Sequence, residues 1–229
     1  CEHLCAAGVC FIFLMGLNKA LREANFYQKI AEPDLLMLLD LVALGTVCDV
    51  VPLIGINRAF VCKGLQVLSM RKNVGIKALA DVSGVGEKLA GYHLGFVLGP
   101  RINACGRLGF PSLAAELLFT EDVIRAQELA EKLHDLNSKR RDIEGQILGN
   151  AEALAENQKG NLFIFVHSPN WHSGVIGIVA SKLKEIYNLP VFASVEEGDI
   201  LHGSIRSVAG INVGEIVIAA KEQGLLVAG

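Results

Sequence analysis

The sequence predicts an α/β protein built from two units that a long helix connects. Three observations support this prediction: an apolar segment at residues 41–47, an amphipathic helical pattern from Phe119 to about Asn157, and alternating strand and helix patterns after Gly160. The chain has 229 residues, of which 52% are hydrophobic and 20% charged. It is therefore long enough to bury a sizeable core, and its composition excludes a disordered protein.

The first unit is predicted to be a portion of a parallel-sheet domain. Residues 6–24 carry an apolar segment that is too short to cross a bilayer, so we expect a helix there. A second helix is expected at 33–40, because Pro33 suits the first turn of a helix. Residues 41–47 are apolar on both faces and predict a buried parallel strand, and residues 57–71 predict another helix.

A connecting helix and a smaller α/β unit are predicted to follow. The connecting helix alternates apolar and charged positions without a proline, which is typical of a helix that bridges two domains. We place the domains at 1–120, 121–159 and 160–229, with the boundary near 158–160. The second unit is expected to contain strands at 162–166, 190–195 and 200–205, and helices at 174–187 and 213–223.

Charge and cysteine content narrow the class of protein. The net charge of −3 at pH 7 excludes a generally basic surface, so any nucleic-acid binding needs a local cluster of Arg and Lys. The six cysteines include no Cys-x-x-Cys pair, which predicts reduced thiols and a cytoplasmic location. The chain does not begin with Met, so we expect it to be a piece of something longer.

Asp49 is the first candidate functional residue. It follows the predicted strand directly, and open α/β sheets bind ligands at the carboxyl ends of their strands. A carboxylate in that place is a suitable ligand for Mg²⁺ or Mn²⁺. The alternatives are a helix N-cap or a salt bridge to Arg58.

The segment from Gly99 to Arg107 is the second candidate. It contains Arg101, Asn103 and Arg107, and we expect its glycines and Pro100 to set a tight turn. Arginine binds phosphate oxygens in two-pronged fashion, and asparagine adds a neutral donor. A surface turn with solvated arginines explains the same residues equally well.

The third candidate is the loop at 170–177, which opens a predicted helix. The N–H groups of Ser173 and Gly174 would face an anion there, and His172 could donate to a phosphate or act as an acid. A single histidine, however, is more often a structural hydrogen-bonding group.

The fourth candidate lies at the end of the predicted strand 200–205. Ser204, Arg206 and Ser207 would suit a terminal phosphate. The alternative is a polar strand end without a ligand.

Together these segments resemble the RecJ family of single-strand-specific exonucleases, in the DHH phosphoesterase superfamily. The matching stretches are 40–53 with Asn57 and Arg58, 98–108, 171–183 and 203–208. The resemblance implies that Asp49 ligates catalytic metals and that the second stretch lies near the scissile phosphate. It also implies that the third and fourth stretches belong to a DHH-associated domain, which holds the strand and its 5′ phosphate. The implied catalytic residues are Asp49, Arg101, Asn103, Arg107 and His172, and the implied phosphate-binding residues are Arg58, Ser173, Gly174, Ser204, Arg206 and Ser207.

The resemblance further implies a metal-dependent 5′–3′ exonuclease that acts on single-stranded DNA in recombination and repair. Its cofactor would be a pair of Mn²⁺ or Mg²⁺ ions, and its partners single-stranded DNA, a single-strand-binding protein and a helicase, with no membrane. The Asp-His-His triplet that names the superfamily is absent, as is the Gly-Gly-His motif that the family pattern continues into. One Asp cannot hold two such ions, so we expect the isolated chain to be inactive.

Two other functions stay open at this point. Within the superfamily, the alternative is a phosphodiesterase for short oligonucleotides or cyclic dinucleotides. From another class, the protein could be a catalytically silent relative that binds DNA as a scaffold, although the presence of Asp49 weighs against this.

Overall fold

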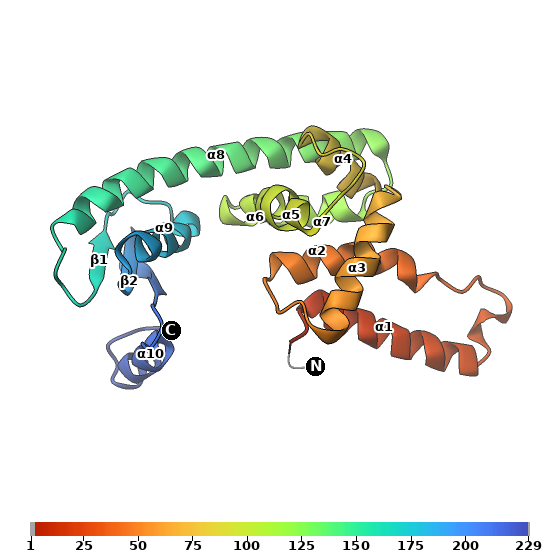
Figure 1. The fold of residues 1–229 in the computed structure, drawn as a ribbon, viewed down its shortest axis with the longest axis horizontal. Coiled ribbons are helices and arrows are strands. Elements are labelled where there is room, and N and C mark those ends of the chain that lie inside the picture. The colour runs from red at the N-terminus through yellow and green to blue at the C-terminus, as the bar shows by residue number, and fades with distance from the viewer. Residues whose placement is uncertain (1–2, 229) are drawn as a thin grey trace. The chain divides into compact units, whose positions relative to one another are not determined.

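The computed structural model describes residues 3–228, which form two compact units that divide after Asn137 (Figure 1). Residues 3–137 form helices only, whereas the second unit combines helices with a three-stranded sheet. The predicted α/β class is therefore confirmed, but the parallel sheet expected in the first unit is not found among these residues. None of the helices between residues 3 and 228 is long and apolar enough to cross a membrane.

The first unit contains short and long helices in close succession. Its elements are α1 (Ala6–Glu23), η1 (Phe26–Gln28), η2 (Leu35–Leu38), α2 (Leu39–Cys48), α3 (Gly55–Ser69), α4 (Val74–Val82), α5 (Gly91–His93), η3 (Leu94–Leu98), α6 (Gly99–Arg107), α7 (Ser112–Phe119) and the first part of α8 (Val123–Glu156). The helices expected at 6–24 and 57–71 are thus confirmed within two residues.

The strand expected at residues 41–47 is wrong, because this segment lies inside helix α2. The helix is apolar on almost all sides, and Val42, Ala43 and Leu44 are buried. A helix buried all round lacks the polar face that gives a 3.6-residue pattern, so a short apolar run cannot be distinguished from a buried strand. The helix expected at 33–40 is correspondingly replaced by the 3₁₀ turn η2 and the start of α2.

Helix α2 is held by a close crossing with α3. A Cβ atom added at Gly64 of α3 would lie 2.2 Å from the Leu39 carbonyl oxygen and 2.4 Å from the Ala43 Cβ. Only glycine permits this approach of the two backbones. Phe11 of α1 and Phe60 of α3 pack edge to face at 5.3 Å between ring centroids, beside buried Leu39 and Val42. Helices α1 and α3 therefore hold the first half of α2 in place.

The segment from Gly99 to Arg107 is also helical, so the tight turn expected there is wrong. Pro100 is the second residue of α6 and, because it has no N–H, leaves one carbonyl of the preceding turn without its helical donor. The preceding segment η3 is π-helical and runs directly into α6, so residues 91–107 form one continuous helical rod. Short π-helical segments are frequent at functional sites.

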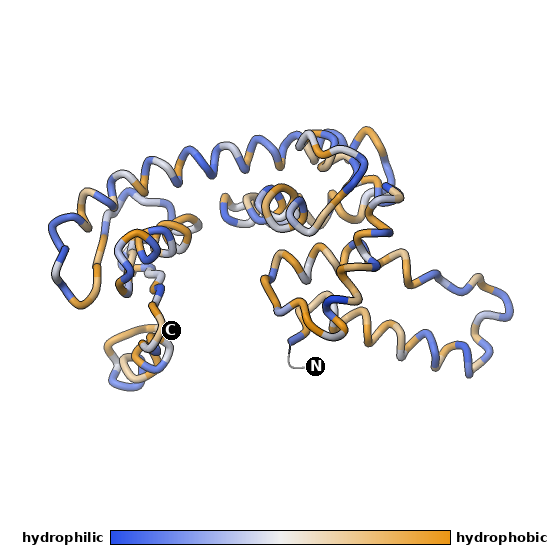
Figure 2. Tube along the Cα trace, in the orientation of Figure 1, coloured by the Kyte–Doolittle hydropathy of each residue, from blue (hydrophilic) through white to orange (hydrophobic). Residues whose placement is uncertain are grey.

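Helix α8 matches the predicted connecting helix. Asp122 begins it, accepting the backbone N–H groups of Ile124 and Arg125. Its N-terminal part buries Leu129 and Leu133 in the core of the first unit, and its C-terminal part buries Ile147 and Ala151 in the core of the second. Figure 2 shows the helix as largely hydrophilic with short hydrophobic stretches, as an amphipathic helix requires.

The second unit contains a β-α-β arrangement followed by a third strand. Its elements are the end of α8, β1 (Ile164–His167), α9 (Ser173–Tyr187), β2 (Val191–Glu197), β3 (Ile200–Arg206) and α10 (Val213–Glu222). Strands β1 and β2 are parallel, with Ile164 opposite Val191, and β3 is antiparallel to β2, with Arg206 opposite Val191. The three strands and two helices predicted after Gly160 are confirmed within two residues.

Helix α9 connects the two parallel strands and covers the core of this unit. Its residues Val175, Val179 and Leu183 are buried together with Val166 and Val191 of the sheet. The hydrophobic spacing of a half-exposed helix and the short apolar strands explain why the sequence predicts this region well.

Candidate nucleic-acid interface

Asp49 lies at the C-terminus of helix α2 and is exposed. Its backbone N–H donates to the Gly45 carbonyl at 3.0 Å, and the residue caps the helix. The next residue, Val50, has a φ of 55°, a left-handed conformation that β-branched residues rarely adopt. Such strain persists only where the surrounding structure fixes it, and it is found most often at functional sites.

Asn57 positions the loop that follows Asp49. Its side-chain Nδ2 donates to the carbonyl oxygens of Pro52 at 3.0 Å and His3 at 2.6 Å, and the residue is buried. This side chain therefore fixes the path of residues 50–54. Sequence reasoning placed Asn57 in a matching stretch but gave it no role, because a positioning contact between distant segments leaves no local pattern.

The end of α2 packs closely on the rod that contains α6. A Cβ atom added at Gly99 would lie 2.6 Å from the Cys48 Sγ and 2.8 Å from the Leu94 carbonyl oxygen. The Cys48 Sγ lies 3.6 Å from the same carbonyl. Burial and the neighbouring Asp49 carboxylate raise the pKa of the Cys48 thiol to about 11, so it stays neutral at physiological pH. Cys48 is thus a packing residue, and Asp49 follows directly beside α6.

Helical geometry separates the three donors that the sequence grouped together. Asn103 and Arg107 follow Gly99 at intervals of four residues, so they lie towards one face of α6, where both are exposed. Residues two apart on a helix face different ways, and Arg101 accordingly points elsewhere. Its Nη1 donates to the Val97 carbonyl at 2.8 Å, and its Nε donates to Nδ1 of His134 on α8 at 3.3 Å. The structure therefore places Asp49 at the end of α2, which packs on α6 at Gly99, and Asn103 and Arg107 further along α6; we call these three residues the α2–α6 site.

Arg58 and Asp49 form no ion pair with each other in the described part of the chain. Arg58 is exposed in the first turn of α3. The salt-bridge alternative for Asp49 is therefore not supported, and the N-cap alternative is wrong, because Asp49 is the C-cap of α2. Among residues 3–228 no three His, Cys, Asp or Glu side chains cluster closely enough to hold a metal ion. Asp49 can supply one ligand.

In the second unit, His172 caps the N-terminus of α9. Its Nδ1 accepts the backbone N–H of Gly174 at 3.1 Å, so the neutral ring carries its proton on Nε2. The preceding residue Trp171 is buried, and its indole N–H donates to Asn150 of α8 at 3.2 Å. Trp171 and Ile176 share one core and so fix the entry into the helix. The structural role of His172 is thus observed, and its Nε2 is the atom that could donate to a phosphate.

Ser204 and Arg206 of β3 meet helix α9 at Gly177. A Cβ atom there would lie 3.1 Å from the Ser204 Oγ and 3.2 Å from the Arg206 Nη2. The Arg206 Nε donates to the Ser181 hydroxyl at 3.0 Å, which in turn donates to the Gly177 carbonyl. The glycine thus lets two polar side chains lie against the helix, one turn from Gly174. We call His172, Gly177, Ser204 and Arg206 the α9–β3 site.

Ser207 does not bond to α9 through its hydroxyl, whereas Ser204 and Arg206 lie against that helix. Its hydroxyl donates to the Ile211 carbonyl at 2.8 Å and so closes the turn that precedes α10. Sequence reasoning grouped it with Ser204 and Arg206, but this hydroxyl is directed at the loop backbone. The sequence places Gly177 at the end of the candidate loop 170–177 without a contact to Ser204 or Arg206, and Ser181, four residues further along the same helix, was not singled out.

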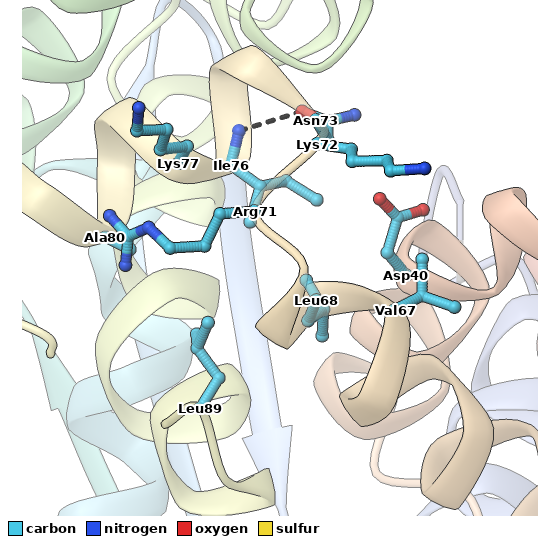
Figure 3. Close-up of a pocket in the computed structure, with 10 residues that line it drawn as sticks. All are labelled: Asp40, Val67, Leu68, Arg71, Lys72, Asn73, Ile76, Lys77, Ala80 and Leu89. Atoms are coloured by element: carbon cyan, nitrogen blue, oxygen red, sulfur yellow. Dashed lines mark hydrogen bonds between the residues drawn. The ribbon is translucent and has the colours of Figure 1, made fainter. Parts of the chain in front are cut away.

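A small cavity in the first unit lies apart from these residues. It is lined by Asp40, Arg71, Lys72 and Lys77, among others, and Figure 3 shows how their side chains surround it. Burial raises the pKa of the Asp40 carboxyl, which accepts the Leu41 backbone N–H at 2.6 Å. The cavity measures about 10 Å³, which is room for at most one water molecule. It is therefore too small for a nucleotide.

Comparison with known proteins shows that this chain is similar to the RecJ exonucleases. The family model of the DHHA1 domain matches residues 159–225. The single-stranded-DNA-specific exonuclease RecJ of Dickeya dadantii is 43% identical over 222 residues, or 93% of this chain and 38% of that protein. RecJ of Escherichia coli is 40% identical over 93% of this chain and 38% of that protein. The chain thus spans less than two-fifths of the length of these relatives.

Solved structures give the same result. A crystal structure of RecJ from Thermus thermophilus in complex with Mn²⁺ has a TM-score of 0.80 and 35% identity, covering 94% of this chain and 31% of that one. A second RecJ structure bound to manganese has a TM-score of 0.77 and covers 51% of that chain. The chain is therefore similar in both sequence and fold to a segment of these proteins.

Proposed function

We propose that this chain, which is homologous to the RecJ exonucleases over more than nine-tenths of its length, is the substrate-holding part of a metal-dependent exonuclease for single-stranded DNA. The observation that carries the proposal is the close packing of the end of α2, where Asp49 lies, on the helix that carries Asn103 and Arg107, in a chain similar to RecJ structures that hold Mn²⁺. We place the protein in the cytoplasm, with a single-strand-binding protein and a helicase as further partners. We also keep the domain boundaries at 1–120, 121–159 and 160–229 as a proposal.

In the α2–α6 site, the acidic side chain would bind a metal ion and the two donor side chains would bind phosphate. Asp49 is exposed at a helix end, so its carboxylate can reach a divalent ion in solution, and an oxygen ligand suits Mg²⁺ or Mn²⁺. When bound, a pair of such ions would activate water for attack on the phosphodiester. Asn103 and Arg107 lie on the adjacent helix face, where an amide and a guanidinium can bind phosphate oxygens and stabilise the charge that develops on them.

The remaining predicted residues keep supporting roles in this proposal. We place Arg101 near the phosphate path as a residue that orients α6, because it is tied to Val97 and His134. Arg58 is an exposed cation in the first turn of α3 and would bind a phosphate further along the strand.

In the α9–β3 site, the side chains suit a terminal phosphate. Arg206 and Ser204 lie against α9 one turn from its N-terminus, where Ser173 and Gly174 are its first residues. Charge-assisted hydrogen bonds from a guanidinium to phosphate are among the stronger ones in proteins. The Nε2 of His172 would add a donor, and Ser207 would support the loop that presents Arg206.

Binding of single-stranded oligonucleotides by the purified chain tests the proposal. We expect fluorescence anisotropy to show tighter binding to a 5′-phosphorylated single strand than to the same strand without the phosphate or to a duplex. Arg206→Ala should remove the preference for the 5′ phosphate, because Arg206 is the only guanidinium of this face and the other donors are the Ser204 hydroxyl and the His172 ring N–H. Asn103→Ala and Arg107→Ala should weaken binding of all single strands, since each removes a phosphate contact of the α2–α6 site.

Lys63→Ala is the matched control, because Lys63 is an exposed cation of α3 that contacts only the neighbouring Gln66 in the described structure. It should leave the affinity unchanged. Equal affinity for single strand and duplex, or for strands with and without the 5′ phosphate, would contradict the proposal.

The chain alone is expected to lack nuclease activity. One carboxylate cannot hold two divalent ions, and no cluster of three metal-ligating side chains exists among residues 3–228. We expect weak Mn²⁺ binding by calorimetry, which Asp49→Asn removes. Robust Mn²⁺-dependent release of mononucleotides by the purified chain would show that this prediction is wrong.

A further inference from the structure

A pair of exposed aromatic side chains lies on the same helical rod as Asn103 and Arg107. Tyr92 of α5 and Phe96 of η3 stack with ring centroids 5.1 Å apart and an interplanar angle of 24°. Their residues are 65% and 72% exposed, respectively, so most of each ring faces outward. Large aromatic groups at this exposure contribute little to the core, and the structure of the unit does not explain them.

The exposed positions of the rod fall on one side. Between residues 91 and 107, the exposed side chains are Tyr92, Phe96, Asn103 and Arg107, whereas Leu94 and Leu98 are buried. The aromatic pair and the predicted phosphate-binding residues therefore lie along one face of a continuous helix. At the helical rise, about 10 Å of axis separates Phe96 from Asn103. Between the two groups, Gly99 packs against Cys48 at the end of α2.

Aromatic rings and phosphate-binding donors along one helix face correspond to the bases and phosphates of a single nucleic-acid strand. Bases stack on aromatic rings without regard to sequence, and phosphates bind to guanidinium and amide donors. Proteins that hold single strands combine these two kinds of contact along one groove or face. A duplex offers no free base faces along its length, so a stacking surface selects unpaired strands.

We propose that Tyr92 and Phe96 form a stacking platform for the bases of the strand whose phosphates Asn103 and Arg107 bind. The proposal rests on the proposed function and deepens it, since it names the group that recognises the unpaired state of the substrate. An exposed aromatic pair could instead bind the surface of another protein. The test distinguishes protein binding from DNA binding.

The test compares substitutions that remove the rings with substitutions that keep them. In the full chain, the double variant Tyr92→Ala/Phe96→Ala should bind a single-stranded oligonucleotide at least about fivefold more weakly by anisotropy. The double variant Tyr92→Phe/Phe96→Tyr keeps both rings and should bind as the unmodified chain does. Tyr92→Leu/Phe96→Leu keeps apolar area without a ring and should remain weak. Because both residues are exposed, none of these variants should lose its helical circular dichroism.

Phe119→Ala is the matched control, because Phe119 is 90% exposed in the same unit but lies outside the rod. It should leave the affinity unchanged. A recovery of binding in the leucine variant, or an equal loss in the Phe119 variant, would overturn the platform in favour of general apolar contact. Self-association that the alanine variant abolishes in sedimentation, with unchanged DNA binding, would assign the pair to a second copy of the chain and overturn the platform too.

An abasic strand of the same length separates stacking from phosphate binding. It should bind the unmodified chain as weakly as a normal strand binds the alanine variant, and that variant should show no further loss on it. The salt dependence should be unchanged by the aromatic substitutions, whereas Arg107→Ala should reduce the slope of log affinity against log salt by about 0.7.

Two different failures can be told apart. If the unmodified chain binds no single strand, the proposed function fails and the platform with it. If Asn103→Ala and Arg107→Ala weaken binding but the aromatic variants and the abasic strand behave like their controls, only the platform is wrong.

Discussion

The α9–β3 site and the α2–α6 site differ in what their polar side chains contact inside the protein. In the α9–β3 site, His172 accepts a backbone N–H and Arg206 donates to Ser181. In the α2–α6 site, the side chains of Asp49 and Asn103 are exposed and make no hydrogen bond to other described residues. Internal hydrogen bonds hold a donor in one orientation before a ligand arrives, so the first site is preorganised. The second offers an open carboxylate and amide, as a metal and a moving phosphate require.

The two sites also differ in what supports them. The α9–β3 site depends on a capped helix and one buried indole, whereas the α2–α6 site depends on close backbone packing at glycines. Substitutions of these supporting residues should therefore differ in how much stability they cost and in whether they affect DNA binding.

The largest effect is expected from Trp171→Ala. The indole is buried and bonded to Asn150, so its removal should cost about 3–5 kcal/mol of the unfolding free energy. Urea unfolding followed by circular dichroism measures the loss. Trp171→Phe keeps most of the apolar volume and should lose only about 1 kcal/mol with the hydrogen bond. Equal losses in the two variants would show that the indole volume does not support the start of α9.

Gly99→Ala should cause the next largest loss of unfolding free energy. The new Cβ would meet the Cys48 Sγ and a backbone carbonyl, neither of which can move freely, so we expect a loss of about 1–3 kcal/mol. Gly106→Ala in the same helix is the matched control, since no atom lies within 4 Å of its added Cβ. It should stabilise the chain by up to about 1 kcal/mol through helix propensity. If Gly99→Ala is instead stabilising in urea unfolding, the α2–α6 packing described above is wrong.

His172→Ala should cost about 1 kcal/mol, because the first turn of α9 loses its cap. His172→Asn keeps a capping acceptor and should restore that stability. Asparagine does not reproduce the Nε2 donor, so binding of a 5′-phosphorylated strand should stay weakened in this variant. Full recovery of both properties with asparagine would limit His172 to its structural role.

The contrast between the units also explains how far the sequence predicts the fold. In the second unit, α9 has one buried and one exposed face, and the strands are short apolar runs, so all five elements agree within two residues. In the first unit, α2 is buried all round, and its pattern was interpreted as a strand. The prediction was wrong because neighbouring helices bury α2 on all sides, and this burial leaves no helical pattern within residues 41–47.

The candidate sites were predictable to a similar degree. Residue types at the right spacing identified Asp49, Asn103, Arg107, Ser204 and Arg206, whose roles stay predictions. The sequence did not show that Arg101 turns away towards His134, because that follows only from the helical state of α6. It also did not show that Gly177 brings Ser204 and Arg206 against α9, since the contact joins a helix to a distant strand.

Gly177→Ala should have the smallest effect on stability and the most informative effect on binding. Its Cβ would press on the Ser204 hydroxyl and the end of the Arg206 side chain, both of which can yield by a few tenths of an ångström. Alanine favours the helix by up to about 1 kcal/mol over glycine, so the net change in unfolding free energy should be near zero. The displaced donors should nevertheless weaken binding of a 5′-phosphorylated strand while leaving the unphosphorylated strand unaffected. Gly99→Ala should show the opposite pattern, a loss of stability without loss of the 5′ preference. If both variants lost stability and binding together, the α9–β3 face would be a packing surface, and the distinction between a preorganised site and an open one would not hold.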